Sequence, residues 1–168
     1  IGFTQKNNEA YSFVCLSGDA MVFKKFSKYI LEKDIISKQD LNKVLDIHKK
    51  KKGSLAEMLV QLGYIKENQL VNILSNYLSI PPVRVSHLNV SKEVLSLVPE
   101  NFAQENNVIP IGKIGNTITL AMADPLNILV IDDTKKITQC EINPVISPLS
   151  EVKDAIIKFY KQAPVQSI

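Results

Sequence analysis

Two segments, FSKYILEKDII at residues 26–36 and LAEMLVQLGYI at residues 55–65, repeat one apolar pattern and decide the fold of the first half of the chain. Sliding the sequence against itself by 29 residues superimposes them, and the same offset places Leu41 over Leu70. Within each copy the apolar residues recur at helical spacing. Each copy therefore predicts a helix, a tight turn and a second helix, and two such hairpins bury their apolar stripes against each other.

The turn and capping residues agree with this prediction. Gly63 is suited to the left-handed conformation that ends a helix, and Asp34 occupies the same place in the first copy at a higher steric cost. Ser37 and Ser54 are each followed three residues later by an acidic residue, the pattern of a capping box. We expect helices from Met21 to Leu78.

The pattern changes after Leu78, because Pro81-Pro82 cannot continue a helix. A domain boundary is therefore expected near Ser79 to Pro82. The elements expected after it are a short strand at 83–85, helices at 91–98 and 100–105, a strand hairpin at 108–111 and 117–122 with its turn at 112–116, a helix at 125–136 begun by Asp124-Pro125, a strand at 141–146, and a last helix from Ser150 that buries Val152, Ala155, Ile156 and Phe159.

The fold class that follows is α+β, in which an all-helical subdomain of two helix-hairpin repeats precedes a small α/β sandwich with a sheet of three to four strands. The expected subdomains are residues 21–80 and 81–162, with residues 163–168 as a tail or linker. Residues 1–20 form an extension without an assignment, since Tyr11 to Leu16 fits a short strand and Gly18-Asp19 fits a turn. The chain starts at Ile1 without Met, which favours a segment of a longer protein.

Composition excludes several classes of protein. With 45% hydrophobic and 22% charged residues the chain is globular, and a net charge of +3 is too small to indicate nucleic-acid binding. Cys15 and Cys140 lie far apart without a second ligand at metal spacing, so neither a disulfide framework nor a zinc site is predicted, and a reducing cytosol fits. No apolar run is long enough to span a membrane.

No catalytic pattern is recognisable either. Gly112-Lys113 resembles the end of a phosphate loop, but Asn107 stands where the first Gly belongs and Ile114 where a hydroxyl residue would hold magnesium. His48 and His87 have no nucleophile in a recognisable setting. Asp132 and Asp133 point about 100° apart on a helix and do not converge on one ion. We expect no catalytic residue, no metal and no cofactor in this chain.

The run from His48 to Lys52 has two interpretations. Lysines at the end of a helix complement its dipole and keep the linker in water, which favours a structural role. The alternative is an anion site for the phosphate of a small ligand or for lipid headgroups.

The second half of the chain resembles a known family. The segment TITLAMADP at residues 117–125, with the strand and helix that follow it, is similar to the amino-terminal domain of type II secretion and type IV pilus assembly ATPases. The upstream segments MLVQLGYI at 58–65, LVP at 97–99 and VIP at 108–110 occur in the same order, so the resemblance covers about residues 21 to 160.

This resemblance implies a non-catalytic docking and regulatory module of a hexameric motor, with the ATPase domains of the same chain lying beyond Ile168. It implies a cytoplasmic location at the inner membrane, where the partner is the cytoplasmic part of the secretion or pilus platform. In one branch of the family the helical repeat binds cyclic di-GMP, and each copy begins Arg-Leu-Gly and ends in Gln. Here Lys25-Phe26-Ser27 and Ser54-Leu55-Ala56 stand on the opening triplets, and His48 and Tyr77 on the closing positions.

Two sets of candidate site residues follow. Both arginines and both glycines of the family's triplets are replaced here, so docking is favoured over nucleotide binding. The candidate residues for nucleotide binding are Lys25, Lys52, Ser54 and Gly63. The docking surface is expected on the helical half, where aromatic and aliphatic residues alternate with lysines. Two short hairpins cannot bury all of these apolar residues, so some are expected to remain exposed. Its candidate residues are Phe23, Lys24, Phe26, Tyr29 and Ile30, with a basic rim suited to an acidic protein surface or to anionic lipid. The alternative is that the apolar residues of this stripe pack on residues 1–20 as part of the core.

Overall fold

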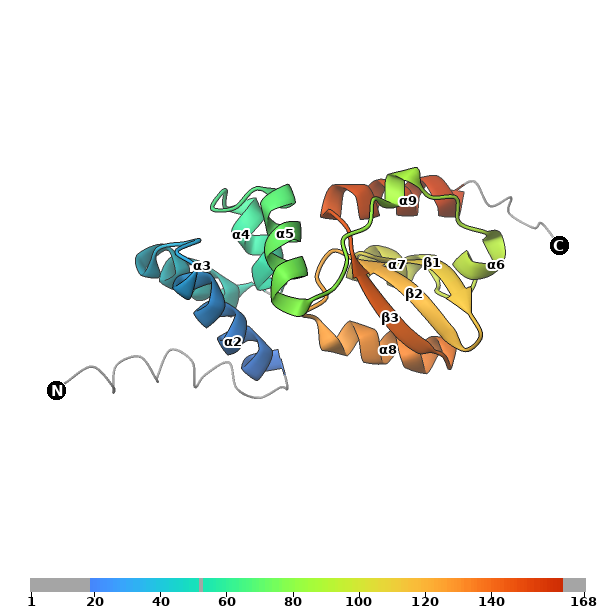
Figure 1. Ribbon diagram of the computed structural model, residues 1–168, viewed down its shortest axis with the longest axis horizontal. Helices are drawn as coiled ribbons and strands as arrows, with labels where there is room; N and C mark the ends of the chain where they lie inside the picture. Colours follow the sequence, from blue (N-terminus) through green and yellow to red (C-terminus); the bar gives the residue numbers. More distant parts are fainter. Residues whose placement is uncertain (1–18, 52, 162–168) are drawn as a thin grey trace. The chain divides into compact units, whose positions relative to one another are not determined.

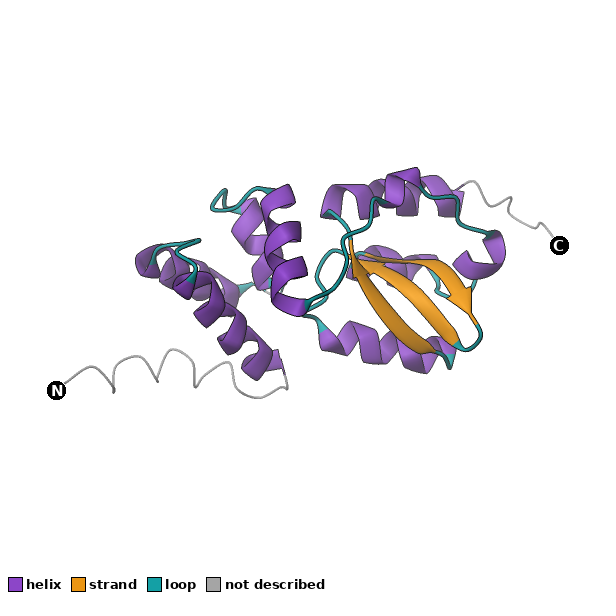
Figure 2. Ribbon diagram, viewed as in Figure 1, coloured by secondary structure: helices purple, strands orange, loops and turns teal. Residues whose placement is uncertain are grey.

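The computed structural model describes residues 19–51 and 53–161. The chain divides into two compact units, Ile1–Lys66 and Glu67–Ile168. Helices form the described part of the first unit, whereas helices and one sheet form the second (Figures 1 and 2). This is the α+β class that the sequence predicts. The assignments left open before residue 19 and the expected tail at 163–168 lie outside the described residues.

The first unit contains α2 (Asp19–Glu32), α3 (Lys38–Lys50) and α4 (Leu55–Gln61). The predicted caps are present, since the Ser37 hydroxyl accepts from the backbone N–H of Asp40 at 3.1 Å and the Ser54 hydroxyl from that of Glu57 at 3.3 Å. The apolar stripes are buried as their spacing predicts. The buried side chains of the three helices include Phe26, Ile30, Leu41, Val44, Leu45, Leu55, Met58 and Leu59.

The second unit begins with α5 (Glu67–Leu78), which differs from the expected division at Ser79 to Pro82. The physical reason is that α5 contacts β3, and that Glu67 binds the start of α9. The remaining elements are η1 (Val85–His87), α6 (Lys92–Leu95), α7 (Glu100–Asn106), β1 (Val108–Ile114), β2 (Thr117–Met122), α8 (Ile128–Thr138), β3 (Glu141–Ile146) and α9 (Leu149–Lys161).

The sheet has the order β1-β2-β3, with β1 antiparallel and β3 parallel to β2. The predicted hairpin is present, but β1 continues to Ile114, so the turn is confined to Gly115 and Asn116. The segment Pro81–Val83 follows the outer edge of β3 for a short distance. Ile146 donates its N–H to Pro81 O at 3.2 Å, and Val83 donates to Ile146 O at 2.7 Å. The expected strand at 83–85 is therefore reduced to this contact, and a 3-10 turn follows it.

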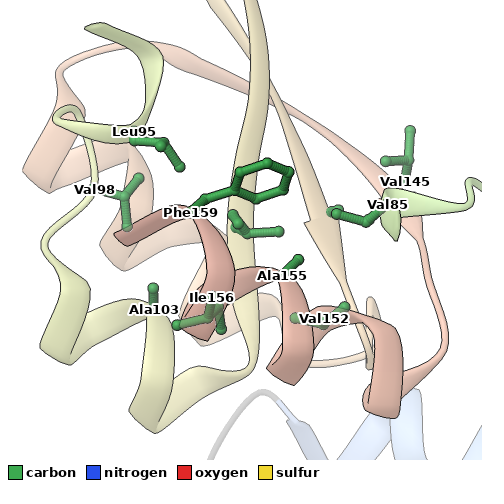
Figure 3. Close-up of a cluster of buried hydrophobic side chains, with 11 residues drawn as sticks. Val85, Leu95, Val98, Ala103, Val145, Val152, Ala155, Ile156 and Phe159 are labelled. Carbon is green, nitrogen blue, oxygen red and sulfur yellow. The ribbon is translucent and has the colours of Figure 1, made fainter. Parts of the chain in front are cut away.

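The two faces of the sheet carry separate apolar clusters. One lies between the sheet and α9, with residues from η1, α6 and α7 completing it (Figure 3). The other lies between the sheet and α8, and it contains Val108, Leu120, Met122 and Val130. Alternate strand residues divide between the clusters, because successive side chains of a strand point to opposite faces. All four residues predicted for the buried face of the last helix are buried there: Val152, Ala155, Ile156 and Phe159.

The end of one helix and the start of another differ from the prediction. Helix α6 ends at Leu95, with turn bonds continuing to Val98. Asp124 does not begin α8: its carboxylate accepts from the N–H of Leu126 at 3.0 Å, which closes a turn, and Asn127 caps the helix through the N–H of Val130 at 3.4 Å. The sequence therefore predicts the start of this helix three residues too early.

Candidate functional site

The candidate docking residues on α2 separate into buried and accessible ones. Phe26 and Ile30 are fully buried, so the expectation that they form part of an exposed apolar patch is wrong. They lie four residues apart on the face of α2 that also buries Ser27, as helical spacing of a buried stripe requires. Phe23 and Tyr29 are half-buried, whereas Lys24 is exposed.

The opposite face of α2 is basic. Lys24, Lys25 and Lys28 are exposed along it, and Met21 on the same side is 67% exposed. We call these three lysines and Met21 the lysine face. Lys28 pairs with Glu32 at 3.6 Å, a contact between two largely exposed side chains that contributes little to stability.

The carboxyl end of α3 lies beside the first turns of α2. The rings of Phe23 and His48 are 4.9 Å apart between centroids, and His48 Nε2 lies 2.8 Å from Gly53 O. The exposed lysines at positions 49–51 therefore lie at the same end of the hairpin as the lysine face. Lys49 is paired with Asp46 at 3.4 Å, which offsets its charge, so Lys50 and Lys51 contribute the positive potential over that end.

The candidate nucleotide residues have structural roles where they are described. Ser54 caps α4, and Gly63 adopts a φ of 79° in the turn that ends it. Lys25 belongs to the lysine face, and Lys52 lies outside the described residues. Ser27 and Ala56, on the positions that are Gly in the cyclic di-GMP-binding branch, are both buried. Ser54 and Gly63 therefore both serve the turns of the helical repeat.

The first turn of α3 carries a small charged network. Asp40 accepts from the Ser37 hydroxyl at 2.8 Å and from Lys43 Nζ at 3.0 Å. The bonds from Lys43 and Ser37 hold the pKa of Asp40 below its usual value, and the bond to Asp40 raises the pKa of Lys43. This network stabilises a helix start and has no substrate-like geometry.

The metal-ligating side chains are dispersed over the part of the chain that the structure describes. No group of three or more His, Cys, Asp or Glu side chains converges there as a metal site would require. Asp133 is paired with Lys136 at 3.3 Å on the exposed side of α8. Within residues 19–51 and 53–161, no helix has the length and apolarity needed to cross a bilayer.

Sequence reasoning missed Met21 as a surface residue. The signal was present, because positions 21, 24, 25 and 28 fall on the side of a helix opposite Phe26 and Ile30. It also missed Glu67 and Ser150, whose contact joins positions 83 residues apart, and local patterns carry no trace of such a pair.

Comparison with known proteins identifies the second unit. The MshEN domain family matches residues 78–166. Two type IV pilus assembly ATPases named PilB are similar to most of the chain. The protein from Myxococcus xanthus is 28% identical over 138 residues, which cover 82% of this chain and 24% of that protein. The protein from Thermus thermophilus is 24% identical over 141 residues, which cover 83% and 16%. The chain thus spans about a quarter or less of these curated relatives.

Solved structures agree with this result. MshE, in a structure with cyclic di-GMP, is 27% identical and superimposes with a TM-score of 0.67 over 80% of this chain and 98% of that one. The N-terminal domain of XpsE, at 20% identity, superimposes with a TM-score of 0.69 over 80% and 93%, and so shows the same fold. The matched region is the amino-terminal domain, which is distinct from the catalytic ATPase domain. The chain belongs to the MshEN family and is an amino-terminal domain of the type II secretion and type IV pilus assembly ATPases.

Proposed function

We propose that this chain is the docking and regulatory module of a pilus assembly or secretion motor, and that it attaches the motor's ATPase domains to the cytoplasmic part of an inner-membrane platform. Membership of the family, with two PilB proteins similar over more than four fifths of the chain, carries the proposal. On this view the protein works in the cytoplasm at the periphery of the inner membrane, with the platform and the downstream ATPase domains as its partners. The module binds and positions, and it catalyses no reaction.

The lysine face of α2 is the surface that we propose for docking. It combines exposed cations with one exposed apolar side chain, and Tyr29 lies half-buried at its border, whereas Phe23 lies on the other side of the helix against His48. Charges at an interface mainly set the rate and specificity of association, so this face suits an acidic partner surface. Phe26 and Ile30 support the face from within and do not touch the partner.

Binding of the whole chain to the purified cytoplasmic platform proteins tests the proposal. Lys25→Glu/Lys28→Glu should weaken binding at least tenfold at low salt. Lys153→Glu/Lys161→Glu, which makes the same change of charge on exposed residues of α9, should alter it less than twofold. Equal loss in both double variants would show a general effect of charge and would reject the lysine face. Failure of the unmodified chain to bind any platform protein would reject docking altogether.

A second candidate function is cyclic di-GMP sensing, which the similarity to MshE favours. The residues here support it less well than docking, since Lys25 and Ser54 replace both arginines of the binding motif and Ser54 is used as a helix cap. Calorimetry of the whole chain with cyclic di-GMP separates the two functions. Micromolar binding that is lost in Lys25→Ala or Lys52→Ala, but kept in Lys43→Ala, would establish sensing.

A further inference from the structure

Helix α5 can be grouped with its neighbours in two ways. The repeat makes it the second helix of the second hairpin, the counterpart of α3. By its packing in the structure, however, α5 is the first element of the unit Glu67–Ile168. Its buried residues Leu70 and Leu74 correspond at the 29-residue offset to Leu41 and Leu45, which are buried as well. The same apolar stripe is therefore compatible with either grouping.

A specific contact holds the first residue of α5 on the α/β unit. Glu67 Oε1 accepts from the backbone N–H of Ser150 at 2.6 Å, and Glu67 Oε2 accepts from the Ser150 hydroxyl at 2.8 Å. Ser150 lies in the first turn of α9, where the N–H groups have no partner within the helix and the dipole favours a carboxylate. We call this pair the Glu67–Ser150 clasp.

The carboxyl end of α5 is fixed differently. Ser79 has a φ of 53°, so the helix ends in a left-handed residue, and Ser75 Oγ donates to Ile80 O at 2.8 Å. The chain then joins the edge of the sheet, where the backbone bonds of Ile146 to Pro81 and Val83 hold it. These bonds do not involve Glu67. The segment after α5 is thus held on the sheet independently of the clasp.

We propose that the Glu67–Ser150 clasp determines whether α5 moves with the α/β unit or with the helices before it. With the clasp closed, the joint between the units lies at Lys66 and Glu67. With the clasp open, the joint moves to the turn at Ser79 and Ile80, next to prolines that no helix can continue through. The clasp is exposed to solvent, so its two bonds break at small cost and the exchange is reversible.

Distance measurements between two spin labels test this proposal directly. The labels are placed at Asn72 of α5 and Lys153 of α9, both exposed and both in the second unit, in a full chain carrying Cys15→Ser and Cys140→Ala. The parent chain should give one narrow distance distribution. Glu67→Ala should add a second, longer distance, and Ser150→Ala should add a smaller fraction of the same distance, because its N–H still binds the carboxylate.

Three variants complete the experiment. Glu67→Ala/Ser150→Ala should match Glu67→Ala, since the two residues act through one contact. Glu67→Gln retains an acceptor and a donor for Ser150, so it should stay close to the parent chain. Glu141→Ala breaks the exposed pair with Lys135 at 3.1 Å, away from the clasp, and should give only the narrow distance.

Hydrogen exchange on the same proteins distinguishes release of α5 from general loosening. Glu67→Ala should speed amide exchange in α5 at least threefold and leave β2 unchanged. A single distance in Glu67→Ala, the same second distance in Glu141→Ala, or equally faster exchange in α5 and β2 would each overturn the proposal. None of these readouts depends on a platform protein, so failure of docking and failure of the clasp are distinguishable.

Discussion

Asp34 and Gly63, 29 residues apart, occupy equivalent left-handed positions, with φ of 52° and 79°. The backbone bonds around them are the same in the two copies. The N–H of Ile35 donates to Ile30 O, and the N–H of Tyr64 donates to Leu59 O, each at 3.0 Å. The N–H groups of Asp34 and Gly63 each donate to the carbonyl three residues earlier, at 3.1 Å and 3.0 Å. The internal repeat is therefore present in the geometry of the turn as well as in the apolar pattern.

Gly63→Ala should lower the free energy of unfolding by about 1 kcal/mol, because a left-handed residue with a Cβ is strained. Nothing lies within 4 Å of the position that the new Cβ would take, so the cost comes from the backbone alone. Gly63→Asn should cost less, since Asn tolerates this conformation. Urea denaturation measures both values. Gly112→Ala, equally open but without a positive φ, is the control, and an equal loss there would contradict the explanation.

Ser27→Ala should keep or raise stability. The Ser27 hydroxyl is 1% exposed and has no hydrogen-bond partner among the described residues, and an unsatisfied buried polar group costs about 1–3 kcal/mol. The equivalent residue of the second copy is already Ala56, which is fully buried. Ala56→Ser should therefore destabilise the chain by about 1–2 kcal/mol. Thermal unfolding compares the pair, and a clear loss in Ser27→Ala would mean that the hydroxyl has a partner.

Tyr160 should make stability depend on alkaline pH. Its hydroxyl donates to Val98 O at 2.9 Å and lies 3.4 Å from Leu95 O. Burial, and to a lesser extent the charge of Glu100, raise the pKa of Tyr160 above its usual value of 10.0. The folded state then keeps a proton that the unfolded chain loses, so this contribution is complete below about pH 10 and declines as the pH rises further.

Tyr160→Phe measures that contribution. The variant should lose about 1 kcal/mol at neutral pH, where the hydrogen bonds are intact in the parent chain. The difference between the two proteins should shrink above about pH 10, as ionisation of the unfolded tyrosine disfavours the parent's folded state. Urea midpoints between pH 7 and 11 give the comparison, and a difference independent of pH would show that burial does not perturb the hydroxyl.

Asn127→Ala should cost about 1 kcal/mol, the usual loss for a helix cap. Asn127→Asp retains the acceptor for the Val130 N–H and should be nearly neutral. Chemical denaturation of both variants tests the assignment of the start of α8. If Asn127→Ala is neutral, the first turn of α8 does not depend on this side chain.

Local chemistry made most of the fold predictable. Ser37 and Ser54 each cap a helix as their spacing indicates, and the hairpin strands pair as expected. Asp124 shows the limit, because an Asp that precedes Pro closes a turn or caps a helix with the same side-chain oxygen. Burial of Phe26 and Ile30 depends on how far the neighbouring helices cover α2, which periodicity does not encode. For the candidate site, the sequence identified the lysines of α2, but it did not predict that they share with Met21 one exposed face opposite Phe26.

The outer edge of β3 has a consequence for association between molecules. Odd-numbered residues of β3 turn their N–H groups toward β2, as Glu141 does to Asn116 O, so even-numbered residues face outward. Ile146 is already bonded to the Pro81–Val83 segment, and Pro144 has no N–H to offer. Along the outer edge of β3, a strand from another molecule could therefore accept a hydrogen bond only from the N–H of Ile142. This edge of the sheet is protected against edge-to-edge growth into fibrils by a proline placed where the ladder would otherwise extend.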